Sequence, residues 1–155
     1  MRKFEYVKKS KEYIEEYGEF KLPERSTANS AGYDFFSPVD IVIPPFGRNT
    51  KPTLVPTGIK AQMEKDEFLM LVNRSSNPGK KFLVIPNSLG IVDADYYGNS
   101  SNEGEMFFAF YNLNSDNVVI NAGDKLGQGI FQKYLVTDDD KAEGERTGGF
   151  GSTGA

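Results

Sequence analysis

The sequence predicts an all-β domain, either a sandwich or a barrel, and three observations indicate this class. Val and Ile together number 18, against 9 Leu and 8 Ala, and 12 Phe and 8 Tyr accompany them. Branched and aromatic side chains fit a pleated sheet, whereas a helical domain would be richer in Ala and Leu. The 16 Gly and 8 Pro residues interrupt the chain at short intervals, which is typical of many short strands joined by turns.

Most expected elements are bounded by these turn residues. Residues 3–8 alternate aromatic and charged side chains, as an edge strand does. Residues 10–17 carry apolar side chains on one side, as a short helix does, and Gly18 follows as its end. Further strands are expected at residues 32–36, 39–43, 53–55, 58–63, 68–73, 82–85, 106–111, 117–120 and 129–136.

The length of 155 residues fits one domain with a tail. Residues 137–155 contain one large apolar side chain, Phe150, and five glycines in the last twelve positions. Such a segment cannot bury enough surface to fix itself in place, so we predict a domain over residues 1–136 and a mobile, Gly-rich tail over 137–155. Composition leaves two interpretations open: a frayed terminus, or a lid that closes over a phosphorylated aromatic ligand through Arg146 and Phe150.

The absence of two residue types narrows the chemistry. The chain has no Cys, which excludes disulfides, thiolate nucleophiles and cysteine-based metal sites. It also has no His, which excludes Ser-His-Asp triads and imidazole ligands. Catalysis would therefore rest on carboxylates, Lys, Tyr or hydroxyl groups, or on a hard metal ion held by oxygens.

Charge and hydropathy bear on partners and location. The net charge of −4 lacks the basic excess expected of a nucleic-acid-binding domain. No apolar run reaches membrane-spanning length, and residues 1–20 are too charged for a secretory signal. We therefore expect a cytoplasmic protein that binds neither nucleic acid nor a membrane, with bacterial and phage origins both open.

Five segments carry candidate chemistry: Ser30–Asp34, Arg74–Ser76, Asn87–Gly98, Gly123–Gln128 and Arg146–Gly154. The guanidinium and two hydroxyls of the second segment are the elements of a phosphate site. The third segment holds Asp93 and Asp95, which share a face if it is a strand and otherwise flank a bend. Without histidine, one of these two is the natural general base. Taken singly, most segments are equally well explained as strand starts or turns.

In this order and spacing, the five segments resemble the motifs of the trimeric dUTP diphosphatase (dUTPase) family, over residues 22–154. The third, GIVDADYYG, and the fifth, RTGGFGSTG, are the specific ones. The resemblance implies a jelly-roll-like β-barrel of the β-clip type and a homotrimer whose shared active sites take the third motif from one subunit and the fifth from a second. The implied reaction is the Mg²⁺-assisted hydrolysis of dUTP to dUMP and pyrophosphate, which keeps uracil out of DNA and supplies dUMP for thymidylate synthesis.

The resemblance also implies a role for each matching residue. Asp93 would activate the attacking water as general base. Asp34 would reach the Mg²⁺ shell through water, with the metal held mainly by the substrate phosphates. The residues implied at the base and sugar are Asn87, Gly90, Ile91, Val92, Tyr96 and Phe150. The residues implied at the phosphates are Arg74, Ser75, Ser76, Gln128, Arg146, Gly151, Ser152 and Thr153.

The chain departs from the family pattern in two places. Lys125 stands where the fourth motif usually has Arg, and a point charge does not replace a bidentate fork, so stability is in question. Asn99–Gly104 is an insertion beside the third motif, and a regulatory protein partner for that region stays open. Two other functions are considered. A dCTP deaminase of the same fold would need a glutamate-centred base, against which Asp93 argues, and a non-catalytic trimeric module would bind nucleotide as a switch.

Overall fold

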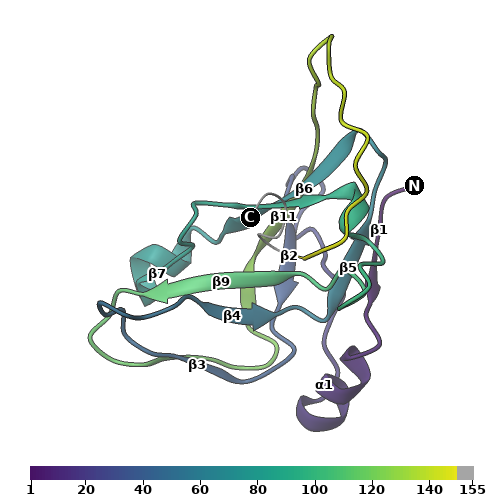
Figure 1. The fold of residues 1–155 in the computed structure, drawn as a ribbon. Coiled ribbons are helices and arrows are strands. Elements are labelled where there is room, and N and C mark those ends of the chain that lie inside the picture. The colour runs from purple at the N-terminus through teal and green to yellow at the C-terminus, as the bar shows by residue number, and fades with distance from the viewer. Residues whose placement is uncertain (150–155) are drawn as a thin grey trace.

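A computed structural model describes residues 1–149 and shows an antiparallel β-barrel with one short α-helix, α1 (Ser10–Tyr17), in that part of the chain (Figure 1). The strands are β1 (Lys3–Tyr6), β2 (Tyr33–Phe36), β3 (Ile41–Ile43), β4 (Thr53–Pro56), β5 (Ile59–Gln62), β6 (Glu67–Asn73), β7 (Leu83–Val84), β8 (Gly90–Asp93), β9 (Phe107–Asn112), β10 (Val118–Ile120) and β11 (Lys125–Lys133). A π-helical turn, Asn77–Lys81, follows β6, and a 3₁₀ turn, Ala94–Tyr96, follows β8. No helix in residues 1–149 has the length and apolar character needed to cross a membrane.

The described strands pair into four small sheets. Their strand orders are β1-β5, β10-β3, β2-β11-β6-β8 and β4-β9-β7. In the four-stranded sheet, β2 and β8 form the two edges, while β11 and β6 lie between them. Figure 1 shows β4 and β9 running crosswise to β2 and β11. The predicted all-β, jelly-roll-like fold is confirmed, and the four-stranded sheet carries most of the residues singled out from the sequence.

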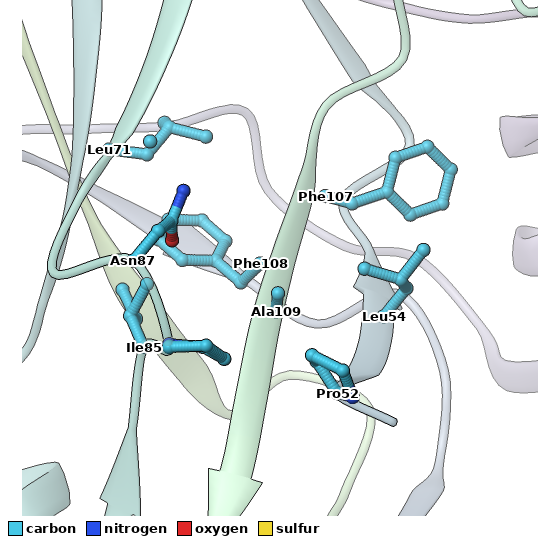
Figure 2. A pocket seen from close by; sticks show the side chains of 10 residues that line it. Pro52, Leu54, Leu71, Ile85, Asn87, Phe107, Phe108 and Ala109 are labelled. Carbon is cyan, nitrogen blue, oxygen red and sulfur yellow. The ribbon is translucent and has the colours of Figure 1, made fainter. Parts of the chain in front are cut away.

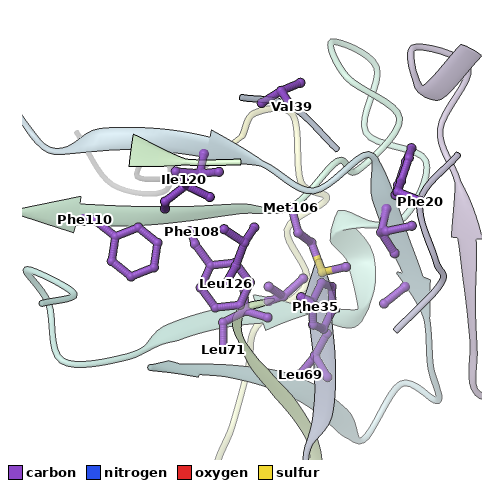
Figure 3. Packing of buried hydrophobic residues seen from close by; sticks show 14 of the residues in the cluster. Phe20, Phe35, Val39, Leu69, Leu71, Met106, Phe108, Phe110, Ile120 and Leu126 are labelled. Carbon is purple, nitrogen blue, oxygen red and sulfur yellow. The ribbon is translucent and has the colours of Figure 1, made fainter. Parts of the chain in front are cut away.

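The core lies between the four-stranded sheet and the sheet that contains β9. Alternate side chains of β6 and β9 are buried, which directs Leu69 and Leu71 from one sheet toward Phe108 and Phe110 from the other. Figure 3 shows these four side chains gathered with Phe35. The rings of Phe35 and Phe108 meet edge to face, with centroids 5.6 Å apart, an arrangement that aromatic pairs favour.

The expected helix at residues 10–17 is confirmed, and most expected strands are confirmed to within two residues. The final strand differs, because it begins at Lys125 and ends at Lys133 instead of spanning 129–136. Its first half contains glycines, whose missing side chains hide the alternation of a strand. At Gly129, a Cβ would lie 2.7 Å from Cε2 of Phe35, so a core ring fills the space that a side chain would need.

The N-terminal segment joins the barrel wall through β1 and α1. β1 pairs with β5 in antiparallel register, and the hydroxyl of Ser10 donates a hydrogen bond to the carbonyl of Gly58 (2.6 Å). Tyr13 of α1 is buried, and its hydroxyl donates to the carboxylate of Glu105 (3.2 Å). These contacts place the N-terminal residues beside the segment that follows the third motif.

Candidate active site

The turn that joins β7 to β8 carries the start of the third motif, and these two strands pair with different neighbours, β9 and β6. β8 pairs with β6, so that Gly90 lies opposite Leu71. Ser88, in the turn, has a left-handed backbone (φ 68°), and the N–H of Leu89 donates to the carbonyl of Asn87 (2.8 Å). The chain therefore turns tightly between the two strands, and the exposed Asn87 lies in this turn.

An apolar cavity of about 420 Å³ lies beside this turn. Figure 2 shows Leu71, Ile85 and Asn87 on one side of the cavity and Leu54 and Phe107 on the other. The other lining residues are Pro52, Pro86, Gly90, Phe108 and Ala109. Asn87 contributes a polar amide to these apolar walls, and apolar walls with a few placed polar groups are typical of small-ligand pockets of this size.

Arg146 joins the two carboxylates of the third motif. Its Nε–H donates to Oδ1 of Asp95 (2.7 Å), and its Nη2 forms an ion pair with Asp93. Asp93 ends β8 and Asp95 lies in the 3₁₀ turn that follows, so the two residues flank a bend and do not share a strand face. The carboxylates are 53% and 59% exposed, whereas the Arg146 side chain is 12% exposed. The Asp93 carboxylate is therefore accessible to water, but in this chain it is ion-paired with the Arg146 guanidinium.

Tyr96 lies under the same guanidinium, whose central carbon is 5.7 Å from the ring centroid. The residue is only 3% exposed. Its hydroxyl donates to the carbonyl of Glu105 (2.9 Å) and accepts a hydrogen bond from Nδ2 of Asn102 (2.7 Å). Burial raises the pKa of Tyr96 above its ordinary value, so the hydroxyl remains a hydrogen-bond donor at neutral pH.

Asp34 of the first motif is buried on β2, the other edge strand of the sheet. Its Oδ2 accepts hydrogen bonds from Ser26 (2.6 Å) and Lys125 (2.7 Å), and its Oδ1 accepts one from Nε2 of Gln128 (3.0 Å). Burial alone would raise the pKa of Asp34, but the hydrogen bonds, led by that from Lys125, lower it. The carboxylate is therefore ionised, and Lys125 supplies the positive charge expected of the usual arginine.

The surroundings of Asp34 fit an outer-shell role toward Mg²⁺. A carboxylate has about four acceptor positions, and the protein contacts of Asp34 use three of them. One position on Oδ1 remains to accept a hydrogen bond from a metal-bound water. No group of three or more carboxylates gathers within residues 1–149. A single carboxylate agrees with an ion that keeps several waters and binds mainly to phosphate oxygens.

The second motif, Arg74–Ser76, follows β6 and is held by two asparagines that flank it. Nδ2 of Asn77 donates to Oδ1 of Asn73 (2.8 Å) and to the carbonyl of Leu126 (2.9 Å). Nδ2 of Asn73 donates to the carbonyl of Leu83 (2.9 Å). Within residues 1–149, the side chains of the motif itself make no hydrogen bond or ion pair. The amide pair thus fixes the backbone, while the guanidinium and hydroxyls stay available.

These groups occupy two separate places in one chain. Asp34 lies opposite Gln128, which lies opposite Val72, whereas Asp93 lies opposite Phe68. Asp34 and Asp93 are therefore three strand spacings and four residues apart, which corresponds to about 20 Å. Four of the residues implied at the phosphates, Arg74, Ser75, Ser76 and Gln128, lie near Asp34, at the end of β6 that leads into the second motif, whereas Arg146 lies beside Asp93. A single chain does not bring Asp93 and those four residues to one point.

The tail returns to the third motif of its own chain. Figure 1 shows it extending away from the barrel after β11 and then coming back. Nδ2 of Asn99 donates to the carbonyl of Gly148 (3.0 Å), two residues after Arg146. The predicted contacts of Phe150, Gly151, Ser152 and Thr153 lie outside the described residues. The resemblance implies that a second subunit supplies the fifth motif, whereas here Arg146 contacts the third motif of the same chain.

Three supporting residues lie outside any motif singled out from the sequence: Ser26, Asn73 and Asn102. Ser26 is eight residues before Asp34 and contacts it only because the chain folds back at β2. Asn73 and Asn77 frame the second motif four residues apart, and this spacing is the one pattern that points to their pairing. Nothing in the local sequence indicates that Asn102 reaches Tyr96.

Fold and site together define an antiparallel β-barrel protein with a carboxylate-centred, histidine-free site. Residues 18–154 match the model of the family described as dUTPase. The deoxyuridine 5'-triphosphate nucleotidohydrolase of Lactococcus lactis subsp. lactis is 45% identical, over 100% of this chain and 99% of the relative. The enzyme of the same name from Wolinella succinogenes is 32% identical, over 86% of each chain. The chain belongs to the dUTPase family.

Solved structures agree with this membership. The crystal structure of dUTPase from Streptococcus mutans is 40% identical with a TM-score of 0.76, over 87% of this chain and 98% of that one. The dUTPase from phage phi11 of S. aureus is 19% identical with a TM-score of 0.69, over 93% and 97% of the two chains. At that identity, the phage structure supports the fold alone.

Proposed function

We propose that this chain hydrolyses dUTP to dUMP and pyrophosphate, and thereby keeps uracil out of DNA and supplies dUMP for thymidylate synthesis. The observation that carries the proposal is the solvent-accessible carboxylate of Asp93, at the end of the strand that borders the Asn87 cavity. The relatives from L. lactis and W. succinogenes bear the name of this activity. Membership in the dUTPase family supports the same reaction.

Asp93 acts as the general base. Its carboxylate takes a proton from water, the water oxygen bonds to the α-phosphorus, and the bond from that phosphorus to the bridging oxygen breaks. Pyrophosphate leaves with the electron pair. A positioned base of this kind contributes about 10²–10⁴ to the rate. Before this step, Arg146 releases the carboxylates of Asp93 and Asp95 and binds the γ-phosphate. The phosphate accepts the same bidentate, charge-assisted hydrogen bonds.

The turn between β7 and β8, together with β8 itself, provides selectivity for the base. Asn87 and the backbone of Gly90–Val92 bind the edge of uracil. A 5-methyl group clashes with the tight turn, and cytosine presents a donor where uracil presents an acceptor, so its binding leaves buried polar groups unpaired. Tyr96 packs on the deoxyribose and leaves no room for a 2′-hydroxyl, while Phe150 stacks on the base.

The triphosphate is bound by cationic, hydroxyl and amide groups: Arg74, Ser75, Ser76, Gln128, Arg146, Gly151, Ser152 and Thr153. Gln128 donates one amide hydrogen to Asp34, and its second amide hydrogen serves a phosphate oxygen. Asp34 accepts hydrogen bonds from the waters of Mg²⁺. When bound, Mg²⁺ neutralises negative charge on the phosphates.

The active unit is a homotrimer whose subunits complete one another's sites. The separation of about 20 Å between Asp34 and Asp93 in one chain supports this assembly, because the two carboxylates serve the same triphosphate. A closed three-fold ring repeats the same junction three times and yields three equivalent sites. The reaction takes place in the cytoplasm of a bacterium, whether the gene is chromosomal or phage-borne.

The test is pyrophosphate release from dUTP, dTTP, dCTP and UTP in the presence of Mg²⁺. We expect rapid release from dUTP and little from the other three nucleotides. Comparable rates on dTTP would contradict the assignment of the uracil pocket. Ammonia release from dCTP would assign the chain to the deaminases of the same fold, and nucleotide binding without turnover would indicate a non-catalytic module.

A further inference from the structure

The insertion Asn99–Gly104, here called the 99–104 loop, is held firmly against the N-terminal half of the domain. The carboxylate of Glu103 accepts a hydrogen bond from the N–H of Lys8 (2.8 Å) and pairs with Nζ of Lys60 (3.4 Å). Gly104 closes the loop with a left-handed backbone (φ 89°), where a Cβ would lie 2.5 Å from the carbonyl oxygen of Tyr96. The loop therefore has one defined backbone path.

In both asparagines of the loop, the side-chain oxygen accepts hydrogen bonds within the loop, and the side-chain nitrogen donates to groups outside it. Oδ1 of Asn99 accepts from the N–H (3.1 Å) and hydroxyl (2.7 Å) of Ser101. Oδ1 of Asn102 accepts from the N–H of Gly104 (3.1 Å). A backbone N–H can only donate, so these bonds fix the orientation of each amide. The two NH₂ groups consequently point out of the loop.

The outward NH₂ groups contact two different parts of the candidate site. Asn102 donates to the hydroxyl of Tyr96 (2.7 Å), which itself donates to the carbonyl of Glu105 (2.9 Å). Asn99 donates to the carbonyl of Gly148 in the tail (3.0 Å). Tyr96 lies under Arg146, and Arg146 pairs with Asp93. One loop thus touches both the ring and the tail segment that meet at the proposed base.

We propose that Asn102 and Asn99 are positioning residues for the dUTPase reaction, an inference that rests on the proposed function. Asn102 fixes the plane of the Tyr96 ring and so sharpens the rejection of a 2′-hydroxyl. Asn99 holds the tail backbone against the third motif in the nucleotide-free chain, and so keeps Arg146 on Asp93 until substrate binds. Recognition groups act only when held within about 0.5 Å and 10–20° of the productive geometry, and the 99–104 loop provides this support from outside the motifs.

Two isosteric substitutions test the proposal. Asn102→Asp and Asn99→Asp each keep the inward acceptor that shapes the loop and replace the outward donor by a carboxylate oxygen. Ser100→Asp is the matched control, because it adds the same charge to the same loop at an exposed position. Within residues 1–149, the Ser100 side chain makes no hydrogen bond that would be lost. Thermal unfolding checks that all three variants retain the fold.

Relative to Ser100→Asp, Asn102→Asp should lower the ratio of kcat/KM for dUTP to that for UTP by about tenfold, through the loss of one hydrogen bond. A ratio within twofold of the control would overturn the role of Asn102. Should Asn102→Asp fold poorly, Tyr96→Phe removes the same hydrogen bond from the other partner, together with the one to Glu105, and should lower the ratio at least as much. The double variant should then lose no more selectivity than Tyr96→Phe.

Asn99→Asp should increase the rate of trypsin cleavage after Arg146 by about tenfold in the nucleotide-free protein, because the tail opens more often. Cleavage as slow as in Ser100→Asp would overturn the role of Asn99. The trypsin measurement does not depend on turnover, and calorimetric affinities for dUDP and UDP provide a readout for Asn102 that does not depend on it either. If the parent chain did not hydrolyse dUTP, the proposed function would fail, but the trypsin rates and the calorimetric affinities for dUDP and UDP would still decide both roles.

Discussion

Arg146 is ion-paired with Asp93, so the cation of the fifth motif lies on the carboxylate proposed as general base in the third. The same guanidinium bonds Asp95 and covers the ring of Tyr96. The guanidinium occupies both carboxylates of the motif. Under the proposed mechanism, substrate binding therefore moves Arg146 away before Asp93 acts on water.

Replacing Asp93 by Asn should lower kcat by about 10²–10⁴, while dUTP still binds, because only proton abstraction is lost. Asp95→Asn is the matched control, since it removes the other carboxylate of the same guanidinium at a similar exposure. Steady-state pyrophosphate release gives kcat, and calorimetry gives the affinity. An unchanged kcat in Asp93→Asn, with the loss appearing in Asp95→Asn, would assign the base to Asp95.

Deleting all residues after Lys141 should abolish turnover and leave the fold intact. The deletion removes the ion pairs of Arg146 and the bond from Asn99 to Gly148, and pairs with such exposed carboxylates contribute about 0–1 kcal/mol each. The melting temperature should therefore fall by only a few degrees, at about 2–4 °C per kcal/mol for a chain of this length. A drop of about 15 °C or more would show that the tail is an integral part of the domain.

Lys125→Met should make the chain sensitive to acid. The pKa of Asp34 is lowered in the folded chain, so its stabilising contribution is present above the ordinary pKa and is lost as pH falls through the folded value. Without the Lys125 ammonium, the pKa of Asp34 rises and this loss begins at higher pH. Stability at pH 7 should fall by about 1–3 kcal/mol, because a buried carboxylate loses a charged partner.

The control for this experiment is Lys133→Met. The pair of Lys133 and Asp66 has the same 2.7 Å length, but its side chains are 72% and 55% exposed, whereas Asp34 is 5% exposed in its pair with Lys125. The control should therefore cost less than about 1 kcal/mol. Urea unfolding between pH 3 and 7 measures both variants. Equal acid sensitivity in the two would show that the buried position of Asp34 is unimportant.

Mixed trimers test how the sites are shared. Full-length Asp93→Asn chains and otherwise unchanged chains ending at Lys141 are each inactive as homotrimers. In random mixtures at equal levels, about a quarter of the sites should be active if base and tail come from different chains of a closed ring. If each tail served the Asp93 of its own chain, every site would carry a defect. Background activity in verified mixed trimers would therefore contradict the exchange of tails between subunits.

The elements of this fold could be predicted where side chains alternate, as in residues 68–73, and where a helix is amphipathic, as in residues 10–17. The last strand was misplaced because its glycines leave no pattern, since Phe35 fills the space beside Gly129. The motifs could be identified from the sequence. The distance between the first and third motifs could not be predicted, because it depends on the strand register, in which Asp93 lies opposite Phe68. Asn102 lies in an insertion with no periodicity, so only the folded loop reveals its contact with Tyr96.

The position of Asp34 and Asp93 on opposite edge strands has a consequence for the solution behaviour of the protein. If neither edge of the sheet forms a complete site by itself, only the assembled oligomer is catalytically active. The amount of that oligomer depends on subunit concentration by mass action. Specific activity then falls when the protein is diluted below the dissociation constant of the subunits, while the circular dichroism of the barrel stays the same. Activity in such a protein is lost by dissociation well before it is lost by unfolding.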